Sequence, residues 1–184
     1  MFNGKIKEGK LTEGTKSVLF GCHNPIMHGL AVLRAWKLEY NSWPEWWQII
    51  GIFLHDIGVW GREYLSDDNA KIGHWELGAN LTFFLVFFLV FILAKNLPCR
   101  RMAHKARDFV AGHCPEESGY PPSLLMRADK RSWLVAPLWW MKWNYWLEGF
   151  KGFTPILWRQ LVRENLKLEK PIGNHELYIK HRIK

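Results

Sequence analysis

Apolar residues recur along this chain at the three- and four-residue spacing of amphipathic helices, and no segment alternates with the period of a half-buried strand. The pattern predicts an all-α fold in which helices bundle around one core. The expected helices cover residues 25–39, 44–58, 74–95 and 100–113, then a helix from about 123 through the Trp-rich run, and a last helix from 155 to about 168.

Prolines mark where these helices begin, bend and end. Pro44 and Pro155 occupy favoured first-turn positions, and Pro98 prevents the third helix from continuing. Pro137 is expected to kink the fifth helix. Two turn-rich segments, residues 61–73 and residues 114–122 (CPEESGYPP), are expected to be loops.

The aromatic and charge content adds surfaces to this bundle. At 184 residues the chain fits one domain, yet its 12 Trp and 11 Phe exceed what a core of this size uses. Some rings are therefore expected in a pocket, a partner surface or a membrane boundary. The net charge of +8 attracts phosphates, nucleotides, nucleic acid or anionic lipid without choosing among them, and no specific nucleic-acid motif accompanies it.

The cysteines point to a reducing compartment. Cys22, Cys99 and Cys114 are an odd number without CxxC spacing, which argues against a disulfide framework. Lysines interrupt the start of the chain before any apolar run, so no signal peptide is evident. A cytoplasmic protein is therefore expected.

One long apolar segment bears on the expected cytoplasmic location. Residues 77–94 (LGANLTFFLVFFLVFILA) are 18 residues without a charge, at the lower edge of a membrane span. We expect burial in the bundle, because the next helix must return alongside this one and carries charges that do not belong in lipid. Phe surrounds much of the segment, so a homo-oligomer interface or a peripheral membrane contact stays open, and with it a membrane-associated location.

A His-Asp dipeptide carries the first chemical signal. His55 and Asp56 follow a largely apolar helix, where both side chains are costly to bury unless they are paired or bind a metal. Helical spacing also turns His28, His113 and Asp129 toward the interior. Three imidazoles and a carboxylate aimed at one interior favour a shared cation. His28 shares its helix face with Ala31, Val32 and Ala35. His113 shares a face with Met102, Ala106, Phe109 and Val110, and Asp129 shares one with Leu125, Ser132, Trp133 and Ala136.

With His74 added, the order H…HD…H…H…D and the segments FLHDIG, KIGHWELGA and RADK resemble the HD-domain superfamily of metal-dependent phosphohydrolases, in its two-metal variant. The resemblance covers residues 24–133 and implies an HD-domain-like helical bundle with two divalent metal ions. Carried over, His28, His55, Asp56 and Asp129 would hold the first ion, and Asp56, His74 and His113 the second.

The resemblance also implies a reaction, the hydrolysis of a phosphoester in a nucleotide or related small metabolite by a metal-activated water, with Asp56 bridging the ions. Further residues near the ligands would contact the substrate, although for any one of them a solvated charge or a core ring is the plainer interpretation. These are Lys71, Arg127 and Lys130 as cations for the phosphate, and Trp60 and Trp75 as rings that stack on a nucleobase.

Two alternatives stay open. Ligand types alone do not separate Mn, Fe, Mg, Co and Zn, and some similar proteins bind a di-iron pair and use oxygen to cleave carbon–carbon or carbon–phosphorus bonds. Asp129 could also pair simply with Arg127 or Arg131. The expected organisation is a single HD-like domain over residues 1–184, with a loose arm at 1–16, a metal-binding helical core at 17–150, and a C-terminal helix with a basic tail at 151–184.

Overall fold

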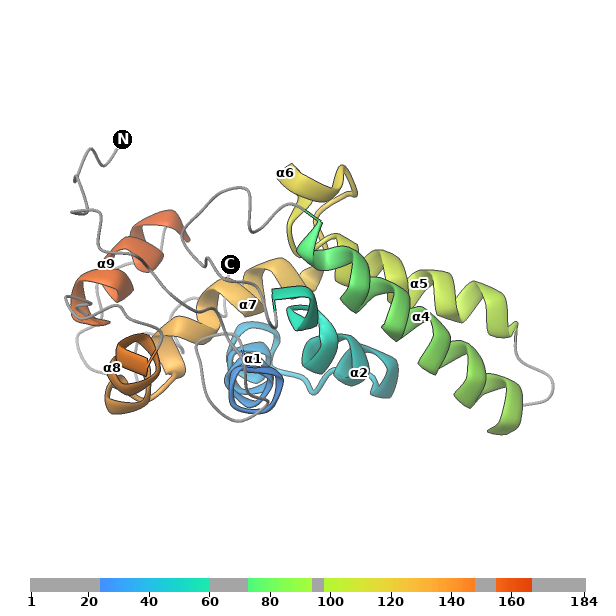
Figure 1. Ribbon diagram of the computed structural model, residues 1–184, viewed down its shortest axis with the longest axis horizontal. Coiled ribbons are helices and arrows are strands. Elements are labelled where there is room, and N and C mark those ends of the chain that lie inside the picture. The colour runs from blue at the N-terminus through green and yellow to red at the C-terminus, as the bar shows by residue number, and fades with distance from the viewer. Residues whose placement is uncertain (1–23, 60–72, 94–97, 148–154, 167–184) are drawn as a thin grey trace.

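A computed structural model describes residues 24–59, 73–93, 98–147 and 155–166 of the chain. Every regular element in these residues is a helix, which confirms the all-α expectation (Figure 1). The elements are α1 (Pro25–Tyr40), α2 (Trp46–Leu54), the short 3-10 helix η1 (Ile57–Val59), α4 (His74–Leu93), α5 (Cys99–Ala111), α6 (Pro115–Ser118), α7 (Leu124–Val135), α8 (Leu138–Leu147) and α9 (Pro155–Asn165).

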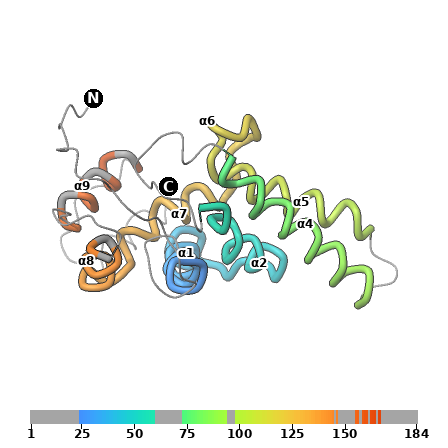
Figure 2. Tube along the Cα trace, in the orientation of Figure 1, coloured from blue at the N-terminus to red at the C-terminus, as the bar shows by residue number. Residues whose placement is uncertain are grey.

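The helices form two groups that meet at the centre of the molecule. α1 packs against α2 and α7, whereas α4 packs against α2, η1 and α5. Figure 2 shows α4 and α5 running side by side away from the rest of the molecule, while α8 and α9 lie at the opposite end. The centre is therefore where α1, α2, α7 and the first turn of α4 come together.

Two apolar clusters hold this arrangement. The larger one joins α1, α2, α4, α5 and α7, and its buried members include Val32, Ile52, Val86 and Leu125. The smaller one joins the end of α7 to α8 and α9. Full burial of one such aliphatic side chain contributes about 1.5–3 kcal/mol, so the larger cluster fixes the relative positions of the helices that carry the candidate ligands.

Local signals set the start of α1 and the end of α2. The Asn24 side chain accepts a hydrogen bond from the Met27 backbone N–H at 2.7 Å, and Pro25 follows as the first helical residue. The second helix, α2, begins at Trp46, close to its expected start near Pro44, but the expected end at Gly58 is wrong, because α2 ends at Leu54. After it the chain tightens into η1, where the Val59 N–H donates to the Asp56 carbonyl at 2.9 Å.

Pro137 separates two helices instead of kinking one. α7 ends at Val135 and α8 begins at Leu138. Ala136, which precedes the proline, has φ −59° and ψ 138° and is therefore extended. A proline ring disfavours helical backbone in the residue before it. The expected single helix with a kink at Pro137 is therefore wrong, because the helix is interrupted there.

The Phe-rich helix α4 is buried on one side only. Gly78, Ala79, Thr82, Val86 and Val90 are its buried residues beyond the first turn and form a single stripe. Only 28% of its most apolar 18-residue stretch is buried. The expectation that this helix is buried in the bundle is therefore wrong for its outer face. By length and composition α4 is the one helix in the described residues that could cross a membrane, which is weak support for a span.

The other boundaries lie close to those expected. α5 does return along α4, and it ends at Ala111, two residues before His113. The irregular segment 114–122 contains the four-residue helix α6, and the last helix ends at Asn165. The expected N-terminal arm, most of the loop at 61–73 and the basic tail lie outside the described residues.

Candidate metal centre

Six side chains from five parts of the chain converge at the centre of the molecule. His28 lies on α1, His55 and Asp56 directly follow α2, and His74 is the first residue of α4. His113 lies two residues after the end of α5, and Asp129 lies within α7. The four histidines and Asp56 are all less than 9% exposed. The structure therefore brings together all six residues singled out in the sequence.

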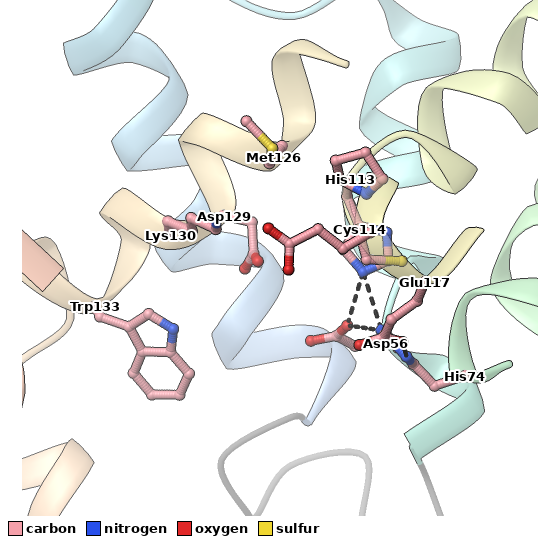
Figure 3. A pocket seen from close by; sticks show the side chains of 11 residues that line it. Asp56, His74, His113, Cys114, Glu117, Met126, Asp129, Lys130 and Trp133 are labelled. Carbon is pink, nitrogen blue, oxygen red and sulfur yellow. Dashed lines mark hydrogen bonds and ion pairs between the residues drawn. The ribbon is translucent and has the colours of Figure 1, made fainter. Parts of the chain in front are cut away.

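Asp56 stands between two sets of histidines. Its Oδ2 lies 3.3 Å from His28 Nε2 and 3.5 Å from His55 Nε2. Its Oδ1 lies 3.8 Å from His74 Nε2 and 3.6 Å from His113 Nε2 (Figure 3). The two oxygens of one carboxylate thus face two different nitrogen pairs, which is the position of a bridging ligand.

Asp129 completes the first set. Its Oδ1 lies 3.0 Å from His28 Nε2 and 3.5 Å from His55 Nε2. One ligand atom from each of His28, His55, Asp56 and Asp129 falls within 4.8 Å of the others, the spacing of atoms around a single ion. The described residues therefore contain a compact donor set of two nitrogens and two oxygens.

Two glycines allow the start of α4 to reach the His-Asp segment. A Cβ at Gly58 would lie 1.8 Å from the His74 carbonyl oxygen, and a Cβ at Gly78 would lie 2.3 Å from the Leu54 carbonyl oxygen. Only a residue without a side chain permits such close backbone approaches. The HDIG and GHWELG segments thus place His74 beside Asp56 through backbone contact.

Hydrogen bonds fix the orientation of three of the imidazoles. His55 Nδ1 lies 2.7 Å from the Ile52 carbonyl oxygen, and His113 Nδ1 lies 2.6 Å from that of Val110. His74 Nδ1 lies 3.2 Å from a carboxylate oxygen of Glu117. Because these oxygens only accept, each Nδ1 carries the proton and each Nε2 of a neutral ring presents a lone pair to the centre.

These lone pairs face one another and the carboxylates. His74 Nε2 and His113 Nε2 are 3.1 Å apart, a contact that needs a proton or a cation between the two nitrogens. His55 Nε2 is buried and lies 3.5 Å from both Asp56 Oδ2 and Asp129 Oδ1. Such a cluster is unfavourable without positive charge at its centre. The donor chemistry therefore fits bound cations.

The same attraction for positive charge shifts the pKa values of the cluster. Burial lowers the pKa of His28, but hydrogen bonds to Asp129 and Asp56 outweigh it and raise the pKa from 6.5 to about 9. Burial also lowers the pKa of His113, but the Asp56 carboxylate outweighs burial and raises that pKa well above its usual value. Burial raises the pKa of Asp129, but the His28 and His55 imidazoles beside its carboxylate outweigh burial and hold the pKa well below its usual range.

A cavity of about 270 Å³ opens onto the cluster. Figure 3 shows Asp129 projecting from α7 toward Asp56, with His74, His113 and Glu117 on the other side. Lys130 is exposed and lines the same cavity, as does Trp133, whose ring centroid lies 5.6 Å from that of His28. Both ligand sets are therefore reached from one opening that also carries a cation.

The other substrate-contacting candidates fall in different places. Arg127 pairs with Glu39 and is absent from the cavity lining, and Trp75 packs against the larger apolar cluster and against Tyr120. Lys71 and Trp60 lie outside the described residues. Of the three that the structure describes, Lys130 is the one at the cavity.

The simpler pairing considered for Asp129 is wrong. Arg127 and Arg131 both pair with Glu39, on α1, and Arg131 is almost fully buried there. Asp129 faces His28 and His55 instead. Successive positions on a helix point in different directions, so α7 uses one side for the Glu39 pairs and another for the cluster.

Sequence reasoning missed three residues at the site. Cys114 lies within 4.8 Å of the ligand atoms of His74 and His113, and Glu117 contacts His74. Both belong to the segment 114–122, which was expected to be a loop and has no helical periodicity to reveal its facing. Trp133 was expected on the same face of the helix as Asp129, but it was not named as a site residue. The position of Cys114 directly after a candidate ligand was the one available signal.

Comparisons with known proteins add no relative: no family model, no curated protein and no solved structure matches this chain.

Proposed function

We propose that this chain is a two-metal phosphohydrolase of the HD-domain kind that acts on a small phosphoester. The observation that carries the proposal is the position of Asp56, whose two oxygens face the His28–His55 pair and the His74–His113 pair. A carboxylate shared by two histidine pairs beside an open cavity suits a pair of ions bridged by that carboxylate. The order of the ligands along the chain supports the same family.

Divalent ions bound at this centre would supply an activated water and would neutralise charge on the phosphate. The chain's own residues hold and orient that centre. Glu117 and the carbonyls of Ile52 and Val110 keep the protons on Nδ1 of three histidines, so that Nε2 is available to a cation. Lys130 adds a positive charge at the cavity for phosphate oxygens that the ions do not contact.

The cavity favours a small substrate with one flat group. Its volume of about 270 Å³ lies just below the range of about 300–1,000 Å³ that is usual for ligand pockets. Trp133 forms part of its wall and presents an aromatic surface for a nucleobase. We therefore propose a nucleotide or a related phosphorylated metabolite as the substrate class.

The test is metal analysis of the purified protein together with a phosphatase screen over nucleotides. The proposal predicts about two ions per chain and release of phosphate from at least one substrate. Asp56→Ala should lose both ions and activity while its far-ultraviolet circular dichroism stays helical. Asp108→Ala, an exposed carboxylate on α5 outside the cavity, is the matched control and should retain both.

Normal turnover by Asp56→Ala would contradict the proposal. So would a wild-type protein that carries iron, consumes oxygen with an organic substrate and releases no phosphate, because the same ligands would then serve an oxygenase. Electron paramagnetic resonance of anaerobically purified protein distinguishes a mixed-valent iron pair from the ions of a hydrolase.

A further inference from the structure

Cys114 lies where the second ion of the proposed centre would need a further ligand. Its Sγ and the ligand atoms of His74 and His113 all lie within 4.8 Å of one another. Cys114 also lines the same cavity as Asp56 (Figure 3). A thiol beside two buried imidazoles and a carboxylate forms a mixed donor set of two nitrogens, one oxygen and one sulfur.

The backbone after α5 holds this thiol in place. α5 ends at Ala111, and the next turn is tied back by the Ser118 hydroxyl, which donates to the Ala111 carbonyl at 2.8 Å. The Cys114 carbonyl accepts from the backbone N–H groups of Glu117 and Ser118, at 3.1 and 3.0 Å, and so starts α6. His113 and Cys114 are thus fixed as neighbours at the mouth of one cavity.

The histidines opposite the thiol are already arranged as ligands. His113 directs Nε2 inward because its Nδ1 donates to the Val110 carbonyl, and His74 does so because its Nδ1 donates to Glu117. Cys114 directly precedes α6 and Glu117 lies within it, so this one short segment supplies both the orienting partner of His74 and a thiol beside it. An outer-shell carboxylate of this kind raises the basicity of the imidazole it holds.

We propose that the Cys114 thiolate is a ligand of the second ion, beside Asp56, His74 and His113, and that it selects a borderline or soft ion such as Zn²⁺ or Fe²⁺ there. The inference rests on the proposed two-metal function and adds one ligand and a metal preference to it. Thiolate sulfur favours these ions over Mg²⁺ and Mn²⁺, which prefer oxygen. The first set, with two nitrogens and two carboxylate oxygens, has no such preference, so the two sites would differ in the ions they retain.

The test loads Co²⁺ into the metal-free, full-length protein and records the near-ultraviolet spectrum, where thiolate-to-cobalt charge transfer absorbs. The wild-type protein should show this band. Cys114→Ser should lose it and still bind Co²⁺, because three ligands of the second ion remain. Cys99→Ser, a partly buried thiol at the start of α5 and distant in sequence from the cluster, is the matched control and should keep the band.

A Zn²⁺ titration of the wild-type protein and of Cys114→Ser measures the effect of the thiol on metal affinity. Loss of an outer-shell partner typically weakens metal binding by roughly 10–100-fold, so loss of a direct sulfur ligand should weaken Zn²⁺ binding at least about tenfold. Mn²⁺ binding should change little, because Mn²⁺ gains little from sulfur. An equal loss for both ions would overturn the metal preference.

The outcomes separate this inference from the proposed function. Two Co²⁺ ions per wild-type chain without a charge-transfer band, or a band that persists in Cys114→Ser, would overturn the thiolate ligand and leave the two-metal centre standing. A wild-type chain that binds no Co²⁺ would overturn both. Since the wild-type spectrum alone can decide against the thiolate, the test does not depend on the folding of the variant.

Discussion

The two ends of α4 carry opposite kinds of side chain into opposite environments. At its first residue, His74 is buried among histidines and carboxylates and is 3.1 Å from His113. Farther along, Phe84, Phe88 and Phe91 are each at least 60% exposed. A polar cluster is therefore inside the molecule while a row of aromatic rings is outside it.

Each end would be stabilised by a bound partner. Buried lone pairs and carboxylates are favourable when they bind positive charge, and a wide apolar surface is favourable when a partner or a lipid boundary covers it. Burial alone therefore does not identify function in this chain. The informative features are the buried polar group and the exposed apolar group, each of which departs from the usual distribution.

The largest expected effect comes from Gly58, which allows the cluster end of α4 to pack. A Cβ there would meet the His74 carbonyl oxygen at 1.8 Å, so backbone must move. Gly58→Ala should lower the free energy of unfolding by about 4 kcal/mol or prevent folding. Gly119→Ala, where φ is +71° and no atom lies within 4 Å, should cost about 1 kcal/mol. Similar denaturation midpoints for the two variants would contradict this account of the close approach.

A smaller effect is expected on the pH dependence of the free energy of unfolding, measured on protein treated with a chelator to remove metal. The His28 pKa is raised from 6.5 to about 9 in the folded state, so protonated His28 stabilises the fold fully below pH 6.5. That contribution, about 3 kcal/mol at about 1.4 kcal/mol per pKa unit, should disappear as the pH rises through 9. Urea titrations between pH 6 and 10 measure it.

His28→Gln should flatten this pH dependence, whereas His104→Gln should leave it unchanged, because His104 packs against Phe83 away from the cluster. A wild-type stability that rises between pH 6.5 and 9 without metal would contradict the assignment. With metal bound the sign reverses, since ions compete with protons for the same nitrogens.

The smallest effects should separate the two faces of α4 at its far end. Val86 is fully buried and Phe88 is 60% exposed, so Val86→Ala should cost about 2 kcal/mol and Phe88→Ala less than about 0.5 kcal/mol. Thermal melts of dilute protein without lipid or detergent measure both. A large cost for Phe88→Ala under these conditions would mean that a second copy already covers the exposed face.

Helical periodicity explains which parts of the site could be predicted from the sequence. The inward facing of His28, His113 and Asp129 followed from the apolar residues three and four positions away. The return of α5 along α4 was expected because the resemblance requires His74 and His113 to meet, and the structure confirms both the packing and the contact. Regular elements make facing predictable, because each position has a fixed direction.

The parts that could not be predicted depend on contacts between distant segments. Arg127 and Arg131 pair with Glu39, 88 and 92 residues earlier in the chain, and nothing local to α7 indicates this. Cys114 and Glu117 reach the cluster from an irregular segment without periodicity. The close approach of the chain after α2 to His74 at Gly58 is likewise a contact between distant segments, and the outer face of α4 is exposed because no described element covers it.

The most direct test of the central claim is anomalous diffraction from crystals of the full chain grown with Zn²⁺ or Mn²⁺. We expect two peaks on either side of Asp56, one among His28, His55 and Asp129 and the other between His74 and His113. A single peak at one of these positions would remove the bridging role of Asp56. No peak at this cluster in crystals that hold the ion elsewhere would contradict the metal centre altogether.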